Sequence, residues 1–256
     1  MRPRRIAGLL GAGTFLLVLV IAAGGDPLAT NMGEVLRAPS LAHPLGTDEL
    51  GRDVLARLAH GAVVTLGTAG TALAAAVLLG TLAGCATGWS TSPVAALVRA
   101  GVDVATALPP LIVALVTALI AGPSTTALLL ALAGVGWLPF ARNADAMTAQ
   151  LRTRNWVLAH RALGAGRLRI WHRSLLPFLA PATGALAAVR LPALVNTVAA
   201  LGFLGLGPPP PSPEWGAMIA ESVDHLGTAP WLLAAPVLAL VAVQALVSAC
   251  FARTRE

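Results

Sequence analysis

The sequence predicts an all-α, polytopic membrane protein with about six transmembrane helices. Of its 256 residues, 57% are hydrophobic and only 11% are charged, and its mean hydropathy is +0.79. A soluble domain usually carries about 25% charged residues. Several uncharged runs reach the roughly 20 residues that a helix needs to cross the hydrocarbon core of a bilayer. Lipid is therefore the main solvent of this chain.

Six apolar runs account for the predicted spans, and breakers rich in Gly, Pro and Ser separate them. The runs lie at 6–25, 62–89, 94–121, 125–141, 178–205 and 230–251. The first is longer than the roughly 7–15 apolar residues of a cleaved signal peptide, which is the other interpretation of this segment. These runs divide the chain into an N-terminal tail and first span (1–25), an extracytoplasmic segment (26–61) and a five-helix core (62–256). A polar loop at 142–177 interrupts the core.

Arginine counting predicts the orientation in the membrane. If the N-terminus lies inside, twelve Arg flank the cytoplasmic ends of the spans, against only Arg37, Arg52 and Arg57 outside. Cytoplasmic loops carry an excess of basic residues. Both termini and the loop 142–177 are therefore expected in the cytoplasm, and the positive net charge reflects orientation rather than binding to nucleic acid.

Composition also excludes several kinds of chemistry. All 17 basic residues are Arg, so the Lys with which a standard P-loop reaches the β- and γ-phosphates is missing. If ATP drives this protein, another chain binds it. Cys85 and Cys250 both lie in apolar runs, where Cys is usually a small buried hydrophobe. No CxxC, HExxH or His/Cys cluster with metal-ligand spacing occurs, so neither a metal site nor a bound cofactor is expected.

The extracytoplasmic segment contains a patterned stretch at 43–57. Thr47 is a candidate N-cap, and Asp48 suits the positive end of a helix dipole. Asp48/Arg52 and Asp53/Arg57 have the i,i+4 spacing of helical ion pairs. We therefore expect a short amphipathic helix on the outer membrane surface. Its characteristic residues are Gly46, Thr47, Asp48, Gly51, Arg52 and Asp53.

Two further polar segments carry information. In the loop 142–177, Ala159 and Ala162 give a small-residue helical surface before Gly164, which can end a helix with positive φ. A second amphipathic stretch follows, and Pro177 closes it. The residues alone allow either a helix at the membrane interface or a docking site for another protein. The third segment, 202–218, combines glycines that permit close packing or a turn with a proline-rich external stretch.

Taken in order, these segments resemble the permease subunits of the dipeptide/oligopeptide/nickel class of ABC importers, over essentially the whole chain. The external stretch is similar to that family's GTDxxGRDVxSR element, with Ala56 where Ser is usual. Residues 158–177 are similar to its "EAA" loop, and Ala159, Gly164 and Pro177 match. Leu158 stands where Glu is usual, and His160 stands where the second Ala is usual. The FLGLG run at 203–207 and the WGAM run at 215–218 complete the resemblance.

The resemblance implies a non-enzymatic transport subunit with the type I permease fold, in the inner membrane of a bacterium. Its implied partners are a second homologous permease, two ATPase subunits that hold ATP and Mg²⁺, and an extracytoplasmic substrate-binding protein. The cargo would be a di- or oligopeptide, or alternatively nickel or another metal chelate. Residues 155–166 would form the helix that the ATPase pushes. The implied coupling residues are Arg154, Leu158, Ala159, His160, Arg161, Ala162, Leu163, Gly164 and Pro177.

Arg190 lies within the fifth predicted span, where a charge needs water or a partner. It is a candidate for the translocation cavity, where it would meet a substrate carboxylate; pairing with an acid of the partner permease is the other interpretation. Two other classes of protein fit this sequence less well. A secondary transporter would need acids or His for ion coupling, and only Asp103 lies within the spans. A membrane enzyme would need its nucleophile or metal ligands at one face, where His43, His60 and two external Asp are the available residues.

Overall fold

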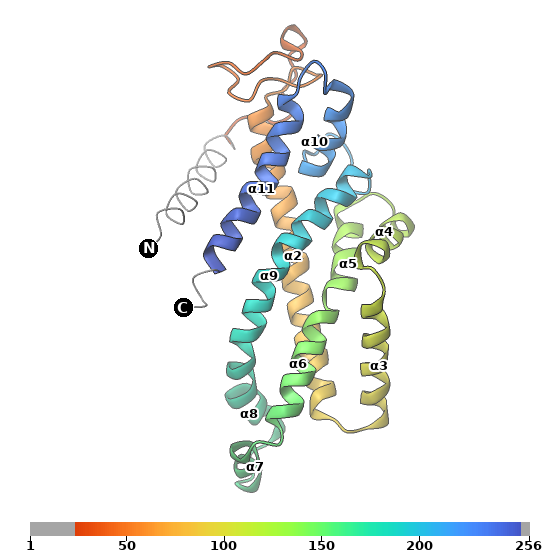
Figure 1. Ribbon diagram of the computed structural model, residues 1–256, viewed down its shortest axis with the longest axis vertical. Helices are drawn as coiled ribbons and strands as arrows, with labels where there is room; N and C mark the ends of the chain where they lie inside the picture. The colour runs from red at the N-terminus through yellow and green to blue at the C-terminus, as the bar shows by residue number, and fades with distance from the viewer. Residues whose placement is uncertain (1–23, 252–256) are drawn as a thin grey trace. The chain divides into compact units, whose positions relative to one another are not determined.

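The structure, a computed structural model, describes residues 24–251, and all of the named secondary-structure elements in this range are helices (Figure 1). The longer helices are α2 (Val54–Trp89), α3 (Pro93–Ala107), α4 (Pro110–Ala121), α5 (Thr125–Gly136), α6 (Leu138–Leu151), α7 (Asn155–Ala162), α9 (Leu176–Phe203), α10 (Trp215–Ser222) and α11 (Trp231–Phe251). Short elements are η1 (Met32–Glu34), α8 (Arg167–Ile170), the π-helix η2 (Trp171–Leu175) and η3 (Val223–His225). Nearly all of the predicted first span, with its flanking Arg, and the two C-terminal Arg lie outside the described residues.

Four of the described helical segments are long and apolar enough to cross a membrane: Val54–Trp89, Thr125–Leu151, Leu176–Phe203 and Trp231–Ala249. The third predicted span, 94–121, is instead the pair α3 and α4, which meet at 94° and would make a fifth span together. A break at Leu108–Pro109–Pro110 explains the bend, because Pro cannot continue the hydrogen-bond ladder of a helix. The all-α, multi-span architecture is confirmed within the described residues.

Three predictions of secondary structure differ from the structure. Helix α2 starts at Val54, eight residues before the predicted 62, and α6 runs to Leu151, well into the predicted loop 142–177. Helix α6 continues because Ala144, Thr148 and Leu151 are buried on one face, so polar neighbours on the other face do not end it. The external segment after 207 is not simply a proline-rich loop, since it contains α10.

The described chain forms two compact units. Unit 1 contains the residues up to Gly70, Ala118–Leu129 and the residues from Leu191 onward; unit 2 contains Thr71–Thr117 and Leu130–Arg190. Helices α2, α4, α5 and α9 each contribute to both units. Each unit has its own buried apolar core.

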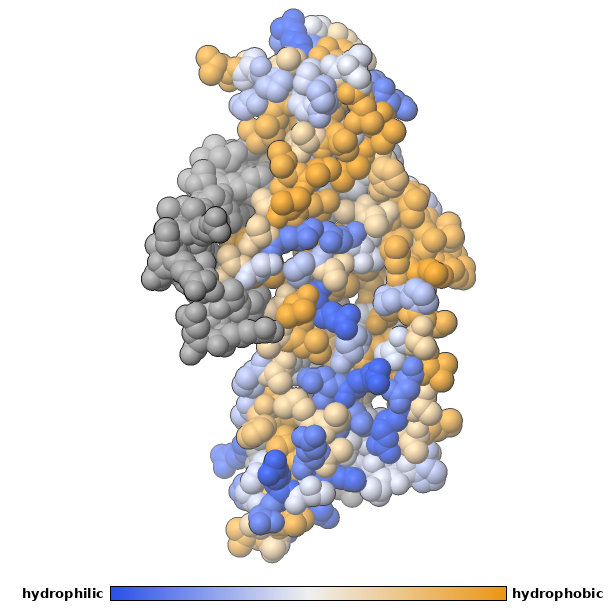
Figure 2. Space-filling view, viewed as in Figure 1, coloured by the Kyte–Doolittle hydropathy of each residue, from blue (hydrophilic) through white to orange (hydrophobic). Residues whose placement is uncertain are grey.

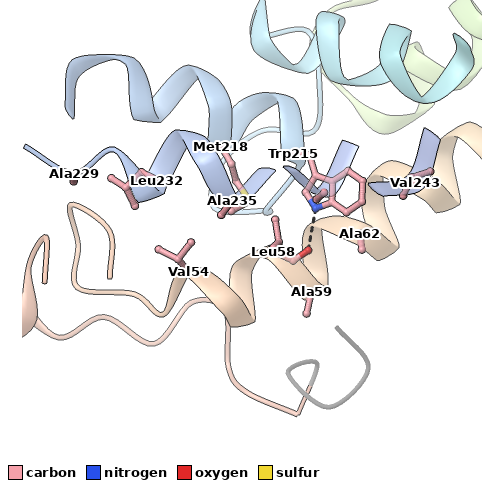
Figure 3. Packing of buried hydrophobic residues seen from close by; sticks show 11 residues of the cluster. Val54, Leu58, Ala59, Ala62, Trp215, Met218, Ala229, Leu232, Ala235 and Val243 are labelled. Carbon is pink, nitrogen blue, oxygen red and sulfur yellow. Dashed lines mark hydrogen bonds between the residues drawn. The ribbon is translucent and has the colours of Figure 1, made fainter. Parts of the chain in front are cut away.

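The core of unit 1 is built around Trp215, the first residue of α10, which is completely buried. Figure 3 shows its indole beside the first turns of α2, where its Nε1 donates a 2.9 Å hydrogen bond to the carbonyl of Leu58. Met218 of α10 and Leu232 of α11 pack into the same cluster. The apolar ring of Trp215 is therefore packed on all sides, and its one donor is hydrogen-bonded, as a buried Trp requires.

In unit 2, three glycines let α2 and α6 approach closely. Gly80, Gly84 and Gly88 are spaced four residues apart, so they form one stripe on α2. A Cβ on Gly84 would collide with the carbonyl of Ala141, and one on Gly88 would collide with the carbonyl of Asp145. Small residues at this spacing allow two helix backbones to come together in a membrane, where packing rather than water drives association.

Ion pairs also tie α3 to α6 in unit 2. Arg99 and Asp103, which have the i,i+4 spacing of a pair within one helix, instead bind across to the neighbouring helix: Arg99 lies 3.4 Å from Asp145, and Arg142 lies 3.1 Å from Asp103. Both acids of these pairs are thereby neutralised by a cation on the other helix. The pairs run between helices because α6 extends far enough to bring partners of opposite charge alongside α3.

We expect Gly84→Ala to lower the free energy of unfolding by about 1–3 kcal/mol, the usual cost of overpacking. Gly70→Ala is the control on the same helix, since a Cβ there meets no atom within 4 Å. This control should be neutral or stabilising by up to about 1 kcal/mol, because Ala favours helix over Gly. Denaturant unfolding of both variants in detergent measures the difference, and equal effects at the two positions would contradict the packing.

Candidate functional site

The predicted docking segment forms helix α7, which stands outside the membrane-spanning segments. It ends as the sequence predicts: Gly164 has φ of +77°. The amide of Gly164 donates to the carbonyl of Arg161, and the amide of Ala165 donates to that of His160 (3.0 and 2.9 Å). These two bonds are the Schellman motif, which satisfies the last carbonyls of a helix. The helix therefore has a fixed length and a sharp end.

One side chain anchors α7 and the rest face outward. Val157 is fully buried, whereas Leu158 is 47% exposed and Leu163 is 83% exposed. All nine predicted coupling residues are exposed: Arg154, Leu158, Ala159, His160, Arg161, Ala162, Leu163, Gly164 and Pro177. Eight of them lie between 154 and 164 on one helix and its flanking residues, while Pro177 is the second residue of α9. Figure 2 shows hydrophilic residues around the end of unit 2 that carries α7 and α8.

The connection from α7 to α9 is helical too. Helix α8 and the π-helix η2 follow one another into α9, and Ile170, Leu175 and Leu179 are buried along them. The predicted second amphipathic stretch is thus a helix, although the side chain of Leu168 lies outside the described part. A displacement of α7 would reach the α9 span through this packed connection.

Arg190 is exposed on α9. Within the described residues it has no ion pair, so the structure supplies no internal partner for its charge. Both interpretations of this side chain, a substrate contact and a bond to a partner subunit, stay predictions.

The external segment is not the predicted amphipathic helix. Residues 43–53 form turns, and an isolated bridge pairs Thr47 with Asp53. Two glycines enforce the turns, since Gly46 and Gly51 have φ of +75° and +70°. The helix starts only at Val54, and its N-cap is Asp53, whose Oδ1 accepts from the amide of Ala56 at 2.8 Å. The prediction failed because glycines at positive φ prevent a helix even where the spacing of charges suits one.

Asp48 is the centre of this external segment. Its Oδ2 lies 2.6 Å from both Arg52 Nε and Arg57 Nη1, and its Oδ1 accepts from the amides of Leu50 and Arg52 at 2.9 Å. The carboxylate is 3% exposed, and the two Arg are 6% and 4% exposed. Glu221, in the last turn of α10, completes the charge balance with a 2.7 Å contact to Arg57. The predicted Asp48/Arg52 pair is therefore present, whereas Arg57 pairs with Asp48 and Glu221 instead of Asp53.

His43 lies between two carboxylates in the same segment. Its Nδ1 is 2.7 Å from Asp53 Oδ2, and its Nε2 is 3.1 Å from Glu34 Oε2. Only the protonated imidazole donates from both nitrogens. The hydrogen bond to Asp53 is the main cause that raises the pKa of His43 above its usual 6.5. Burial opposes this rise, and the hydrogen bond to Glu34 adds a smaller increase.

Glu214 is a buried residue whose role the sequence did not indicate. It is fully buried, and its oxygens accept from the hydroxyl of Thr65 on α2 (2.9 Å) and from the amide of Ala217 on α10 (3.0 Å). A Cβ on Gly202 of α9 would collide with its Oε2. Burial raises the pKa of the Glu214 carboxyl, and the bonds from Gly216, Ala217 and Thr65 oppose that rise. Its position immediately before α10, as an N-cap, is the one signal that could have identified it.

Asp48→Asn should lower the free energy of unfolding by about 3–5 kcal/mol, because it leaves two buried guanidinium groups with only Glu221. Glu49→Gln is the matched control: Glu49 is exposed and its pair is the 3.2 Å contact with His225. Loss of a surface pair should cost less than about 1 kcal/mol. Thermal unfolding in detergent provides the comparison, and a similar small loss in both variants would show that the buried cluster is not a centre of stability.

The raised pKa of His43 predicts a pH dependence of the external segment. Its contribution to stability should be complete below pH 6.5, the usual pKa, and should be lost as the pH rises through the higher folded-state pKa. Hydrogen exchange of the peptide 31–53, corrected for intrinsic rates, should therefore speed up between neutral and alkaline pH. His43→Gln should remove this dependence. Exchange that stays constant in the wild-type protein would contradict the assignment.

Among the described residues, no group of three or more His, Cys, Asp or Glu is placed to hold a metal ion. The charged side chains of the external segment are instead engaged in ion pairs with one another. Comparison with known proteins is consistent with this arrangement.

A family model described as the binding-protein-dependent transport system inner membrane component matches residues 61–253. Among similar proteins is the di/tripeptide transport system permease protein DppC of Pseudomonas aeruginosa, 33% identical over 91% of this chain and 82% of its own. The nickel transport system permease protein NikC of Escherichia coli is 32% identical over 84% of this chain and 78% of its own. The peptide transport system permease protein SapC of Escherichia coli is 33% identical over 77% of this chain and 67% of its own.

The fold is also similar to a solved structure. A chain in an inward-facing conformation of the MetNI methionine ABC transporter matches with a TM-score of 0.61, at 21% identity, over 77% of this chain and 94% of that chain. In this family the ATPase is a separate subunit, and a binding protein delivers the cargo. The chain therefore belongs to the binding-protein-dependent transport system inner membrane component family, as a multi-pass, non-catalytic permease subunit of an ABC importer.

Proposed function

We propose that α7 is the coupling helix through which separate ATPase subunits move this permease. The observation that carries the proposal is the exposure of α7 outside the membrane-spanning segments: apart from buried Val157, all its residues are exposed, and the apolar Leu158 and the C-cap Leu163 are 47% and 83% exposed. Exposed apolar residues that gather on one short segment, rather than lying scattered singly, are typical of a surface for a partner. The described neighbours of α7 leave that surface open.

The packing of α7 supports a mechanical role. Only the three residues 152–154 separate it from α6, and on its C-terminal side the chain continues through α8 and η2 into α9. The Schellman end at Gly164 and the anchor at Val157 make it a rigid piece between two spans. A push by a closing ATPase would therefore tilt α6 and α9 and exchange two discrete states of the pathway.

The distribution of Arg supports an orientation with α7 in the cytoplasm, where the ATPases lie. The proposed assembly contains a second, homologous permease subunit and two ATPase subunits, with both termini of this chain in the cytoplasm. The external segment around Asp48 then faces the binding protein. Its buried charge pairs would keep its surface in one conformation for that contact.

The proposed cargo is a di- or oligopeptide, in line with the relatives that are named as peptide permeases. Nickel or another metal chelate is the second candidate, because a nickel permease is similarly close. Uptake of a radiolabelled dipeptide and of ⁶³Ni²⁺ by wild-type and deletion strains distinguishes the two. Loss of dipeptide uptake alone supports the proposal, and loss of nickel uptake alone contradicts it.

Gly164→Glu should abolish transport while the protein still inserts and assembles, because the carboxylate adds bulk and charge at the end of the docking helix. Gly164→Ala is the control. Both variants meet the same left-handed strain at φ +77°, and neither Cβ meets an atom within 4 Å. The Ala variant should keep most of the transport. Normal uptake by the Glu variant would show that this surface does not couple to the ATPase.

A further inference from the structure

A cavity of about 1020 Å³ opens in unit 2 beside α7. Its lining includes Leu82 and Ala86 on α2, Trp89 at the end of α2, Arg152 after α6, Arg161 on α7 and Trp171 on η2. We call it the interface pocket. Two of the proposed coupling residues, Leu158 and Arg161, also line it, so the pocket adjoins the coupling surface, and the proposed transport mechanism gives the cavity itself no role.

The interface pocket lies where membrane spans end. Helix α2 ends at Trp89, the α5–α6 span ends at Leu151, and the α9 span begins at Leu176. The indoles of Trp89 and Trp171, both partly buried, line the pocket at this level. Trp side chains concentrate at the boundary between the hydrocarbon and the head groups of a bilayer. A pocket lined by two such side chains at the ends of three spans suits the depth of lipid head groups.

The lining combines cations with an apolar floor. Arg161 has no ion pair among the described residues, and Arg152 makes one long bond, 3.4 Å from its Nη1 to the carbonyl of Trp89. None of the residues that line the pocket is acidic. Leu82 lies two helical turns before Trp89, about 10 Å deeper at 1.5 Å per residue. Leu82 is 45% exposed, so apolar surface continues from the cations toward the hydrocarbon.

We propose that the interface pocket binds an anionic phospholipid, with its phosphate between Arg152 and Arg161 and an acyl chain along Leu82 and Ala86. Arg guanidinium groups bind phosphate oxygens with charge-assisted hydrogen bonds, and basic pockets between span ends suit anionic head groups. A soluble phosphate would use the cations but not the apolar floor. Because Arg161 is on α7, the bound lipid links that helix to the span ends and would restrain its movement.

The test uses the complete transporter, reconstituted in nanodiscs of equal phosphatidylcholine and phosphatidylglycerol. After transfer to mild detergent, native mass spectrometry counts the retained phosphatidylglycerol. Arg152→Gln should weaken retention about fivefold, the effect of one basic side chain near an anionic surface. Arg173→Gln is the matched control: Arg173 is exposed and does not line the pocket. It should retain phosphatidylglycerol as the wild type does.

Two further variants separate binding from folding. Ala86→Phe fills the floor without changing charge and should abolish retention, whereas Arg152→Lys keeps the charge and should restore most of it. Wild-type retention in both Arg152→Gln and Ala86→Phe would overturn the proposal, as would an equal loss in Arg173→Gln.

Two additional outcomes would assign the pocket to another ligand and overturn the proposal. Displacement of phosphatidylglycerol by millimolar inorganic phosphate would indicate a site for a soluble anion. Retention only after the ATPase subunits are removed would indicate that an acidic surface of the ATPase occupies the pocket. Because lipid retention is measured without transport, an error in the coupling role of α7 would leave these results unchanged.

Discussion

A charge near hydrocarbon must either be paired or reach water, and the structure is organised around that constraint. In unit 1, Asp48 holds two buried Arg at 2.6 Å, and those three groups fix the turns ahead of α2. In unit 2, Arg99 and Arg142 neutralise acids across the α3–α6 contact. The Arg around α7 are different: in the described part of the chain, Arg154, Arg161 and Arg173 take part in no ion pair. The cations that stabilise the protein and those that remain available to partners therefore lie in different segments.

This distribution of charge suits a subunit of an ABC importer, in which ATP binding and the transport pathway belong to different chains. A chain without Lys cannot contain a standard P-loop, so its contribution to transport is a pathway and a mechanical connection. The connection is compact: one buried Val holds α7, a Schellman turn ends it, and buried apolar residues carry it into α9. The gating account needs only two packed arrangements of these spans and no covalent step. The interface pocket would add the bilayer itself as a partner of the same helix.

Composition and hydropathy predict the membrane class and most of the spans, because a run of about 20 apolar residues is typical of a transmembrane helix. The end of α7 is also predictable, since Gly164 before a polar stretch is a specific local signal. The external segment shows why prediction fails elsewhere. Asp48 and Arg52 have helical spacing and do pair, but Gly46 and Gly51 turn the backbone, so charge spacing alone misassigned the conformation. Glu214 was missed because its hydrogen-bond donor Thr65 lies on α2, far away in the sequence. The stripe Gly80, Gly84 and Gly88 could have been recognised from its four-residue spacing.

The central claim is that the ATPase contacts α7, and cross-linking tests it most directly. A Leu163→Cys substitution, in a chain whose native Cys are replaced by Ala, places one thiol on a side chain that is 83% exposed. Paired with single Cys positions across the ATPase surface, it should cross-link in the assembled transporter, with a yield that changes between nucleotide-free and ATP-bound states. No cross-link to the ATPase in any nucleotide state would contradict the account.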